Sequence, residues 1–176
     1  MQFRIGQGFD LHQFAEERDL ILGGVKIDHN KGLLGHSDAD ALCHAIIDAL
    51  FGALALGDIG QHFPDTDPQY YGCDSTELLA QAMYLVLKEG YKINNIDATI
   101  KTQQPRLGPF IKAIQKNLAD VLNLELNQVS VKAKSMEWMG PIGEGKCLAV
   151  DAVVLLEEIS LSLIHISEPT RPRLIS

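Results

Sequence analysis

The strongest constraint on the fold comes from two short segments, residues 10–12 and 36–44, which together carry three of the six histidines and three carboxylates. Residues 3–12 alternate apolar residues with polar residues or glycine, a pattern that predicts a β-strand. Residues two apart on a strand share a face, so Asp10 and His12 point the same way. Two ligands of one ion need this arrangement, and the density of donors predicts a divalent-metal site.

The second segment predicts a helix that carries a third ligand. Ser37 is the expected N-cap, with Asp38 and Asp40 in the first turn, because helix N-termini favour hydroxyl caps and negative charge. An Ala- and Leu-rich run extends this predicted helix over residues 41–56. His44 therefore lies in its first turns.

Asp10, His12 and His44 form the predicted ligand set. Two imidazoles and a carboxylate can bind zinc and leave a fourth position open, as catalytic zinc sites do. The spacing alone also fits a surface aspartate beside two structural histidines. Asp48, one turn after His44, either orients that histidine from outside the ligand set or is a solvated helix carboxylate; the second interpretation is favoured.

The rest of the chain alternates loosely between strands and amphipathic helices. A strand pair is predicted over residues 20–27 with its turn at Gly23 and Gly24, while Gly6 and Gly8 indicate a bulge or a close backbone approach. Further helices are predicted at 75–89 and 110–122, and further strands at 93–102, 129–134 and 148–156. Together with the length of 176 residues, these elements predict one α+β domain with a single mainly antiparallel or mixed sheet and helices on one face.

The predicted domain spans residues 1–159. Residues 160–176 contain two prolines and scattered apolar residues that fit no periodic pattern, so this tail is interpreted as non-native or disordered.

Composition excludes several classes of function. The net charge of −8 argues against nucleic acid or an anionic membrane as the partner. No apolar run approaches the roughly 20 residues that span a bilayer, and the N-terminus lacks a signal-peptide pattern. Three widely spaced cysteines cannot form a complete disulfide framework, which predicts a reducing, cytoplasmic location.

Two further groups of residues could contact a phosphorylated ligand. Residues 57–72 are long for a connector, which indicates a binding loop, and Asp58 beside Gly60 could hold ribose hydroxyls, although such residues also form ordinary Asx turns. Lys134 and Ser135 could meet phosphate oxygens and Glu137 a magnesium ion, although an ordinary polar strand end looks the same. The sequence contains neither a P-loop nor a nucleophile-elbow motif.

Four motifs, in this order along the chain, resemble the 2-C-methyl-D-erythritol 2,4-cyclodiphosphate synthase family. The resemblance covers about residues 3–158, and its most specific parts are the motifs at residues 5–12, 36–44, 48–53 and 57–67. It implies a homotrimer with sites between neighbouring subunits. The implied reaction cyclises 4-diphosphocytidyl-2-C-methyl-D-erythritol 2-phosphate to 2-C-methyl-D-erythritol 2,4-cyclodiphosphate and releases CMP.

The resemblance also implies a role for each matching residue. Asp10, His12 and His44 would bind Zn²⁺, and Glu137 would bind Mg²⁺ or Mn²⁺. His36 and Ser135 would be catalytic, each stabilising the transition state. The implied contacts to the cytidine diphosphate substrate are Asp10, His12, His36, Ser37, Asp58, Ile59, Gly60, Phe63, Pro64, Asp65, Thr66, Asp67, Thr102, Gln103, Gln104, Pro105, Arg106, Leu107, Gly108, Ala133, Lys134, Ser135, Met136 and Glu137.

The chain departs from one common version of the family pattern in two places. Lys134, Ser135 and Met136 stand where that version has consecutive threonines, and Ser135 keeps a hydroxyl. The glycine-rich loop at residues 140–145 lacks the aromatic residue and the arginine of that version. Lys146 is the nearest replacement cation, although it has no guanidinium fork.

Three alternatives remain open from the sequence. The first is a metal-dependent nucleotide diphosphate hydrolase, which would yield a linear product. The second is a non-enzymatic zinc module, which would need a fourth ligand. The third is a catalytically poor relative whose tail or altered loop blocks assembly.

Overall fold

The structure is a computed structural model, and it describes residues 2–160. From residue 161 onwards, the tail that the sequence sets apart lies outside the described residues. The main sheet has the strand order β4-β1-β7-β5-β6, formed by β4 (Gly32–Leu33), β1 (Phe3–Ala15), β7 (Cys147–Glu158), β5 (Tyr91–Lys101) and β6 (Val129–Lys134). All neighbouring pairs are antiparallel except β5 and β6, which are parallel. The predicted mixed, mainly antiparallel sheet is confirmed.

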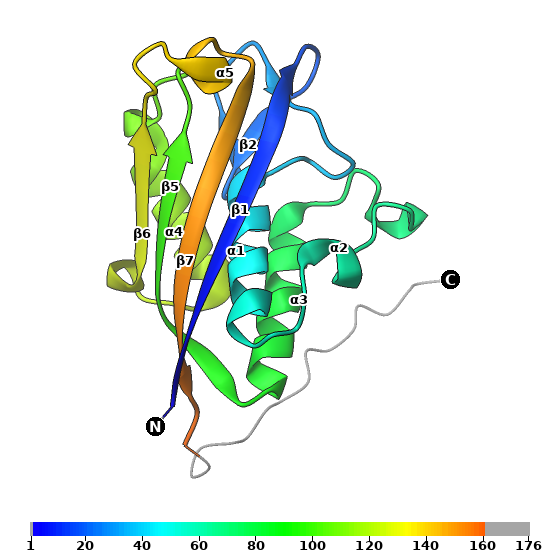
Figure 1. Cartoon of the computed structure of the whole chain (residues 1–176), viewed down its shortest axis with the longest axis vertical. Coiled ribbons are helices and arrows are strands. Elements are labelled where there is room, and N and C mark those ends of the chain that lie inside the picture. Colours follow the sequence, from blue (N-terminus) through cyan, green and yellow to red (C-terminus); the bar gives the residue numbers. More distant parts are fainter. Residues whose placement is uncertain (1, 161–176) are drawn as a thin grey trace.

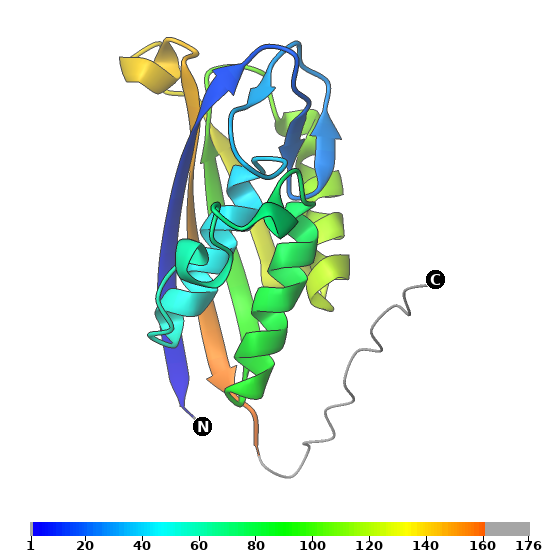
Figure 2. The same cartoon turned by 90° about the vertical axis from the view of Figure 1, so that its right-hand side faces the viewer.

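The long helices cover one face of this sheet (Figures 1 and 2). They are α1 (Ala41–Ala53), α3 (Ser75–Lys88) and α4 (Ile111–Leu122). Helix α1 packs on β1 and β7, α4 packs on β6, and α3 contacts both of these helices. Within residues 2–160, no helix is long and apolar enough to cross a membrane. The predicted one-sided α+β architecture is confirmed.

Two glycines of β1 bring α1 into direct backbone contact with the sheet. A Cβ on Gly6 would lie 1.9 Å from the Ala49 carbonyl oxygen, and a Cβ on Gly8 would lie 1.9 Å from that of Ala45. Only glycine allows the two backbones to approach this closely. The predicted close approach is confirmed. It places the start of α1 beside Asp10, two residues further along the same face of β1.

The opposite face of β1 is exposed and mostly apolar. Phe3, Ile5, Phe9 and Leu11 lie on it and are between 48% and 72% exposed. Val153 of the neighbouring strand β7 is exposed as well. An exposed apolar patch of this kind marks an interaction surface.

The start of α1 differs from the sequence-based expectation. Its N-cap is Asp40 rather than Ser37, and the helix ends at Ala53 rather than residue 56. The Asp40 carboxylate is fully buried and accepts hydrogen bonds from the amides of Gly23, Gly24, Leu42 and Cys43. It therefore joins α1 to the tight turn between β2 (Leu20–Leu22) and β3 (Val25–Ile27), the strand pair that the sequence predicts.

Short helical turns interrupt segments that the sequence presents as loops. They are α2 (Ile59–His62), η1 (Pro68–Tyr70), η2 (Gly108–Phe110), η3 (Leu126–Gln128) and α5 (Gly140–Gly143). Asp58 caps α2 by accepting from the Gln61 amide at 3.0 Å, and Asp67 caps η1 by accepting from the Gln69 amide at 3.0 Å. Residues 57–72, which the sequence presents as a binding loop, therefore contain two short helical turns, each capped by an aspartate.

Candidate active site

Strand β1 and helix α1 bring the three predicted metal ligands together. The Oδ2 atom of Asp10 lies 2.8 Å from His12 Nε2 and 3.0 Å from His44 Nδ1. The two imidazole nitrogens lie 3.4 Å apart. All three groups are only partly exposed, and each offers one ligand atom within 4.8 Å of the others. The set can hold a metal ion.

Hydrogen bonds on the outer edge of each imidazole leave the inner nitrogens free to act as ligands. His12 Nδ1 lies 2.6 Å from the carbonyl oxygen of Leu34, which can only accept. The hydrogen of a neutral His12 is therefore on Nδ1, which leaves Nε2, the nitrogen beside Asp10, to act as a metal ligand. His44 Nε2 lies 2.9 Å from Ser75 Oγ. Such outer hydrogen bonds are typical of metal-binding histidines, so the donor set fits zinc.

The close approach of these groups shifts the pKa of Asp10 and of His12. Burial acts to raise the pKa of Asp10, but the hydrogen bonds and positive charge of His12 and His44 outweigh it and lower that pKa strongly. Burial acts to lower the pKa of His12, and the hydrogen bond and charge of Asp10 outweigh it and raise that pKa. The cluster therefore favours an ionised carboxylate beside cationic or metal-bound imidazole.

The cluster opens into a cavity of about 440 Å³. Its lining residues are Asp10, His12, Gly35, His36, Ser37, His44, Ile59, Gly60, Phe63, Asp65, Tyr70, Cys73 and Leu78. Eight of the residues that the resemblance implies as substrate contacts lie here. Asp58, Pro64, Thr66 and Asp67 belong to the same loop but do not line the cavity.

His36 and Ser37 are adjacent in sequence but face different surroundings. His36 is exposed, and its ring lies edge-on to Tyr71 with 5.2 Å between ring centroids. Ser37 is buried, and its hydroxyl lies 3.2 Å from His44 Nε2 and accepts from the Ala39 amide at 3.1 Å. The Ser37 side chain thus contacts the outer edge of a candidate metal ligand.

The Asp48 carboxylate was expected either to contact His44 or to be solvated, but it accepts a hydrogen bond from the backbone of α2. Its Oδ1 accepts from the Ile59 amide at 2.7 Å, and no hydrogen bond joins it to His44 in the described part of the chain. Burial raises the pKa of Asp48, and the hydrogen bond from Ile59 opposes that rise. Asp48 is therefore an anchor for the start of α2, and both sequence-based interpretations are wrong.

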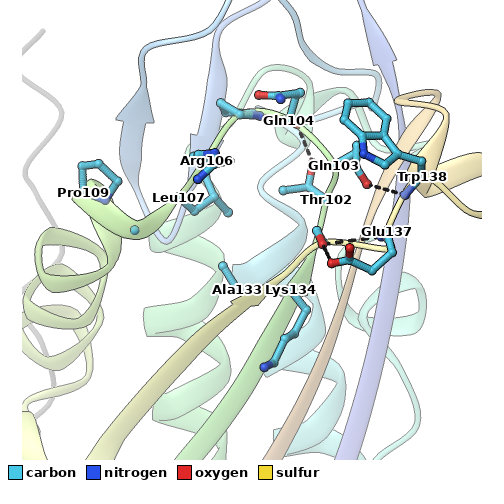
Figure 3. Close-up of a pocket in the computed structure, with 13 residues that line it drawn as sticks. Thr102, Gln103, Gln104, Arg106, Leu107, Pro109, Ala133, Lys134, Glu137 and Trp138 are labelled. Carbon is cyan, nitrogen blue, oxygen red and sulfur yellow. Dashed lines mark hydrogen bonds between the residues drawn. The ribbon is translucent and has the colours of Figure 1, made fainter.

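A second cavity, of about 610 Å³, lies where the parallel strands β5 and β6 end (Figure 3). Because the two strands run the same way, the loops that follow them leave the sheet at one edge. The lining residues are Thr102, Gln103, Gln104, Pro105, Arg106, Leu107, Gly108, Pro109, Ala133, Lys134, Ser135, Glu137 and Trp138. Every substrate contact that the resemblance implies in these two loops lines the cavity, except Met136. Pro109 and Trp138 also line it, although the resemblance does not imply them.

One hydrogen bond between the two loops and one within the loop after β6 connect residues that line this cavity. The Trp138 amide donates to Gln103 Oε1 at 3.1 Å, and Ser135 Oγ donates to Glu137 Oε1 at 2.5 Å (Figure 3). Glu137 and Trp138 both have positive φ angles, 49° and 65°. Such consecutive left-handed residues are uncommon outside functional sites. They turn the Glu137 carboxylate back over Ser135.

The late glycine-rich loop, residues 140–145, contributes no lining residue to the second cavity. Lys146, the nearest replacement for the missing arginine, forms an exposed ion pair with Glu144. That pair raises the pKa of Lys146. Neither residue lines the second cavity.

Fold and site together define a class: an α+β protein with a candidate metal centre in a ligand-sized cavity. Residues 3–157 match the model of the YgbB family. A 2-C-methyl-D-erythritol 2,4-cyclodiphosphate synthase of Clostridium perfringens is 55% identical over 153 residues, covering 87% of this chain and 98% of that protein. A synthase of the same name from Laribacter hongkongensis is 55% identical over 157 residues, covering 89% of this chain and 97% of that protein.

Solved structures agree with these relatives. The bifunctional IspDF of Campylobacter jejuni has a TM-score of 0.89 and 41% identity, covering 92% of this chain and 44% of that one. IspF of Plasmodium falciparum, in a CDP complex, has a TM-score of 0.79 and 40% identity, and the match covers 90% of this chain and 97% of that one. The chain belongs to the YgbB family. It is similar over most of its length to the 2-C-methyl-D-erythritol 2,4-cyclodiphosphate synthases named above.

Proposed function

We propose that this chain is a phosphorus–oxygen lyase that cyclises 4-diphosphocytidyl-2-C-methyl-D-erythritol 2-phosphate to 2-C-methyl-D-erythritol 2,4-cyclodiphosphate and releases CMP. The observation that carries the proposal is the convergence of Asp10, His12 and His44 on one point inside a ligand-sized cavity. Relatives that bear the name of this synthase match nearly the whole chain. A relative of known structure binds CDP.

The reaction needs little covalent chemistry from the protein. The 2-phosphate of the substrate attacks the β-phosphorus, the bond from that phosphorus to the α-phosphate bridging oxygen breaks, and CMP leaves with that oxygen. The protein has to position two anionic groups against their repulsion. Metal cations would neutralise phosphate charge and act as Lewis acids.

Residues of both cavities supply the remaining positioning. Asp10, His12 and His44 would hold Zn²⁺, and Glu137 would hold Mg²⁺ or Mn²⁺. The exposed His36 imidazole and the Ser135 hydroxyl would donate to phosphate oxygens as charge develops, which is the role of transition-state stabilisers. Lys134 would add a positive charge at the second cavity.

We further propose a homotrimer whose sites lie between neighbouring subunits. The implied substrate contacts fall into two cavities that share no lining residue within residues 2–160. One subunit would therefore bind the metal-facing phosphate and its neighbour would bind the cytidine. The open apolar face of β1 supplies the contact surface. A cytoplasmic location fits the three cysteines, which are all unpaired.

The proposal is tested by CMP release from the cytidine substrate with and without a chelator. The chelator and the His44→Ala variant should both abolish release, and the variant should also lose bound zinc. His29→Ala is the matched control, because His29 packs on Phe14 outside the cluster. Full activity of His44→Ala without zinc would overturn the metal assignment.

The nature of the product separates this function from diphosphate hydrolysis. Phosphorus NMR should show a cyclic diphosphate in the native reaction, whereas a linear product would make the chain a hydrolase. Metal binding without any turnover would instead indicate a structural zinc module. Size-exclusion chromatography with light scattering tests assembly, because a monomer would lack complete sites.

A further inference from the structure

His44 is held from behind by a chain of two hydrogen bonds. Its Nε2 atom lies 2.9 Å from Ser75 Oγ, and Ser75 Oγ in turn donates to Asp38 Oδ1. Ser75 is the first residue of α3, and its side chain is fully buried. Asp38 precedes α1 by three residues and is half-buried. Three separate parts of the chain thus meet behind one candidate metal ligand.

The direction of these hydrogen bonds determines which nitrogen of His44 carries the hydrogen. The Asp38 carboxylate accepts from the amide and the hydroxyl of Ser75, and from the Asp40 amide at 3.2 Å. The Ser75 hydroxyl has one hydrogen and gives it to Asp38. Towards His44 the same oxygen can only accept, so Nε2 carries the hydrogen. In a metal-bound His44, Nδ1 would then be the nitrogen without a hydrogen, and this nitrogen faces Asp10 and His12.

The hydrogen bonds of the Ser37 hydroxyl are consistent with donation from His44 Nε2 to Ser75 Oγ. Ser37 Oγ accepts from the Ala39 amide and lies 3.3 Å from Ser75 Oγ. Ser37 can therefore donate to Ser75, which already accepts from His44. A satisfied set of hydrogen bonds results in which every member has one consistent role.

Backbone hydrogen bonds join the segment that precedes α1 to the segment that precedes α3. The Gly72 amide donates to the His36 carbonyl oxygen at 2.9 Å, and the Asp38 amide donates to the Cys73 carbonyl oxygen at 3.1 Å. The segment before α1 is therefore joined to the segment before α3, beside Asp38 and Ser75.

We propose that Asp38 and Ser75 are positioning residues that present His44 to the metal through Nδ1. The proposal rests on the metal assignment made under the proposed function, and it extends that assignment to two residues outside the ligand set. Groups in this position orient the imidazole and raise its basicity, and removing them commonly costs 10–100-fold in metal affinity. Neither residue touches substrate in this role.

Zinc affinity of the purified full-length protein tests the proposal, measured by competition with a chromophoric chelator. Ser75→Ala should weaken zinc binding about 10–100-fold. Asp38→Asn should weaken it at least as much, because the amide can donate to Ser75 Oγ and turn the Ser75 hydrogen towards His44 Nε2. The hydrogen of His44 would then lie on Nδ1, where the metal binds.

Asp74→Ala is the matched control. Asp74 is the N-cap of α3 and accepts from the Thr76 amide at 2.8 Å, but it does not contact Ser75 Oγ or His44. Its removal loosens the same helix start by taking away the cap. Zinc affinity should stay within about twofold of the native value. Thermal unfolding of each metal-free variant separates loss of stability from loss of affinity.

Two results would overturn the proposal: native zinc affinity in Ser75→Ala, or an equal loss of affinity in Asp74→Ala and Ser75→Ala. If Asp38→Asn does not fold, the pair Ser75→Ala and Asp74→Ala still decides the question. Zinc binding by the native protein without CMP release would contradict only the proposed function. Absence of zinc binding by the native protein would overturn both the metal assignment and the role of Ser75.

Discussion

Gly8 of β1 lies directly against the backbone of Ala45 in α1, so that a Cβ on Gly8 would stand 1.9 Å from the Ala45 carbonyl oxygen. This contact involves the residue next to His44. It explains how a strand and a helix come close enough for Asp10 to lie 3.0 Å from His44. Close backbone packing and the candidate metal centre therefore depend on one another.

Gly8→Ala should destabilise the protein and weaken zinc binding together. The added methyl group has to push α1 away from β1, which we expect to cost about 3 kcal/mol or more in the free energy of unfolding. Denaturant unfolding and chelator competition measure the two effects. Gly52→Ala is the control, because its Cβ would lie 3.7 Å from the Gln7 carbonyl oxygen. That helical, exposed site should gain about 0.5–1 kcal/mol.

Asp48→Ala should weaken substrate binding and leave zinc affinity unchanged. The Asp48 carboxylate holds the Ile59 amide at the start of α2, and Ile59 and Gly60 line the first cavity. A lost hydrogen bond to a charged group costs about 1.5–3 kcal/mol, so we expect KM to rise about tenfold or more. Asp120→Ala, which removes an exposed helix carboxylate paired with Lys116, should change neither value. A loss of zinc from Asp48→Ala would show that Asp48 orients His44 after all.

Lys146→Ala should leave KM for the cytidine substrate within about twofold. Lys146 is exposed and paired with Glu144, and exposed ion pairs contribute little because water screens them. It does not line either cavity. Steady-state kinetics of CMP release provides the measurement. A tenfold rise in KM would mean that Lys146 replaces the missing arginine in the assembled protein.

Ile5→Lys should prevent assembly. Ile5 is 72% exposed on the apolar face of β1, and a charge there cannot be buried against another subunit without a large desolvation cost. Light scattering should give a monomer mass for this variant and a trimer mass for the native chain. Leu126→Lys is the control, since Leu126 is 59% exposed but lies in η3, outside that face. A trimeric Ile5→Lys variant would exclude this face from the interface.

Local sequence patterns predict the cluster of Asp10, His12 and His44 and most of the fold. Alternation at residues 3–12 predicted β1, and with it the shared face of Asp10 and His12. The Ala- and Leu-rich run predicted α1 and placed His44 on it. The N-cap was misassigned to Ser37, because either a serine or an aspartate can cap a helix and only the turn at Gly23 and Gly24 selects Asp40.

The ligand types, their spacing and the two backbone periodicities were therefore determined by the sequence alone, because each depends on residues within a few positions of one another. Tertiary structure decided which polar groups pair across long separations. Asp48 bonds to Ile59 rather than to His44, and Ser75, 31 residues from His44, takes the orienting position. No periodicity encodes such pairs, because a buried hydrogen bond depends on where the packed backbones bring each donor and acceptor.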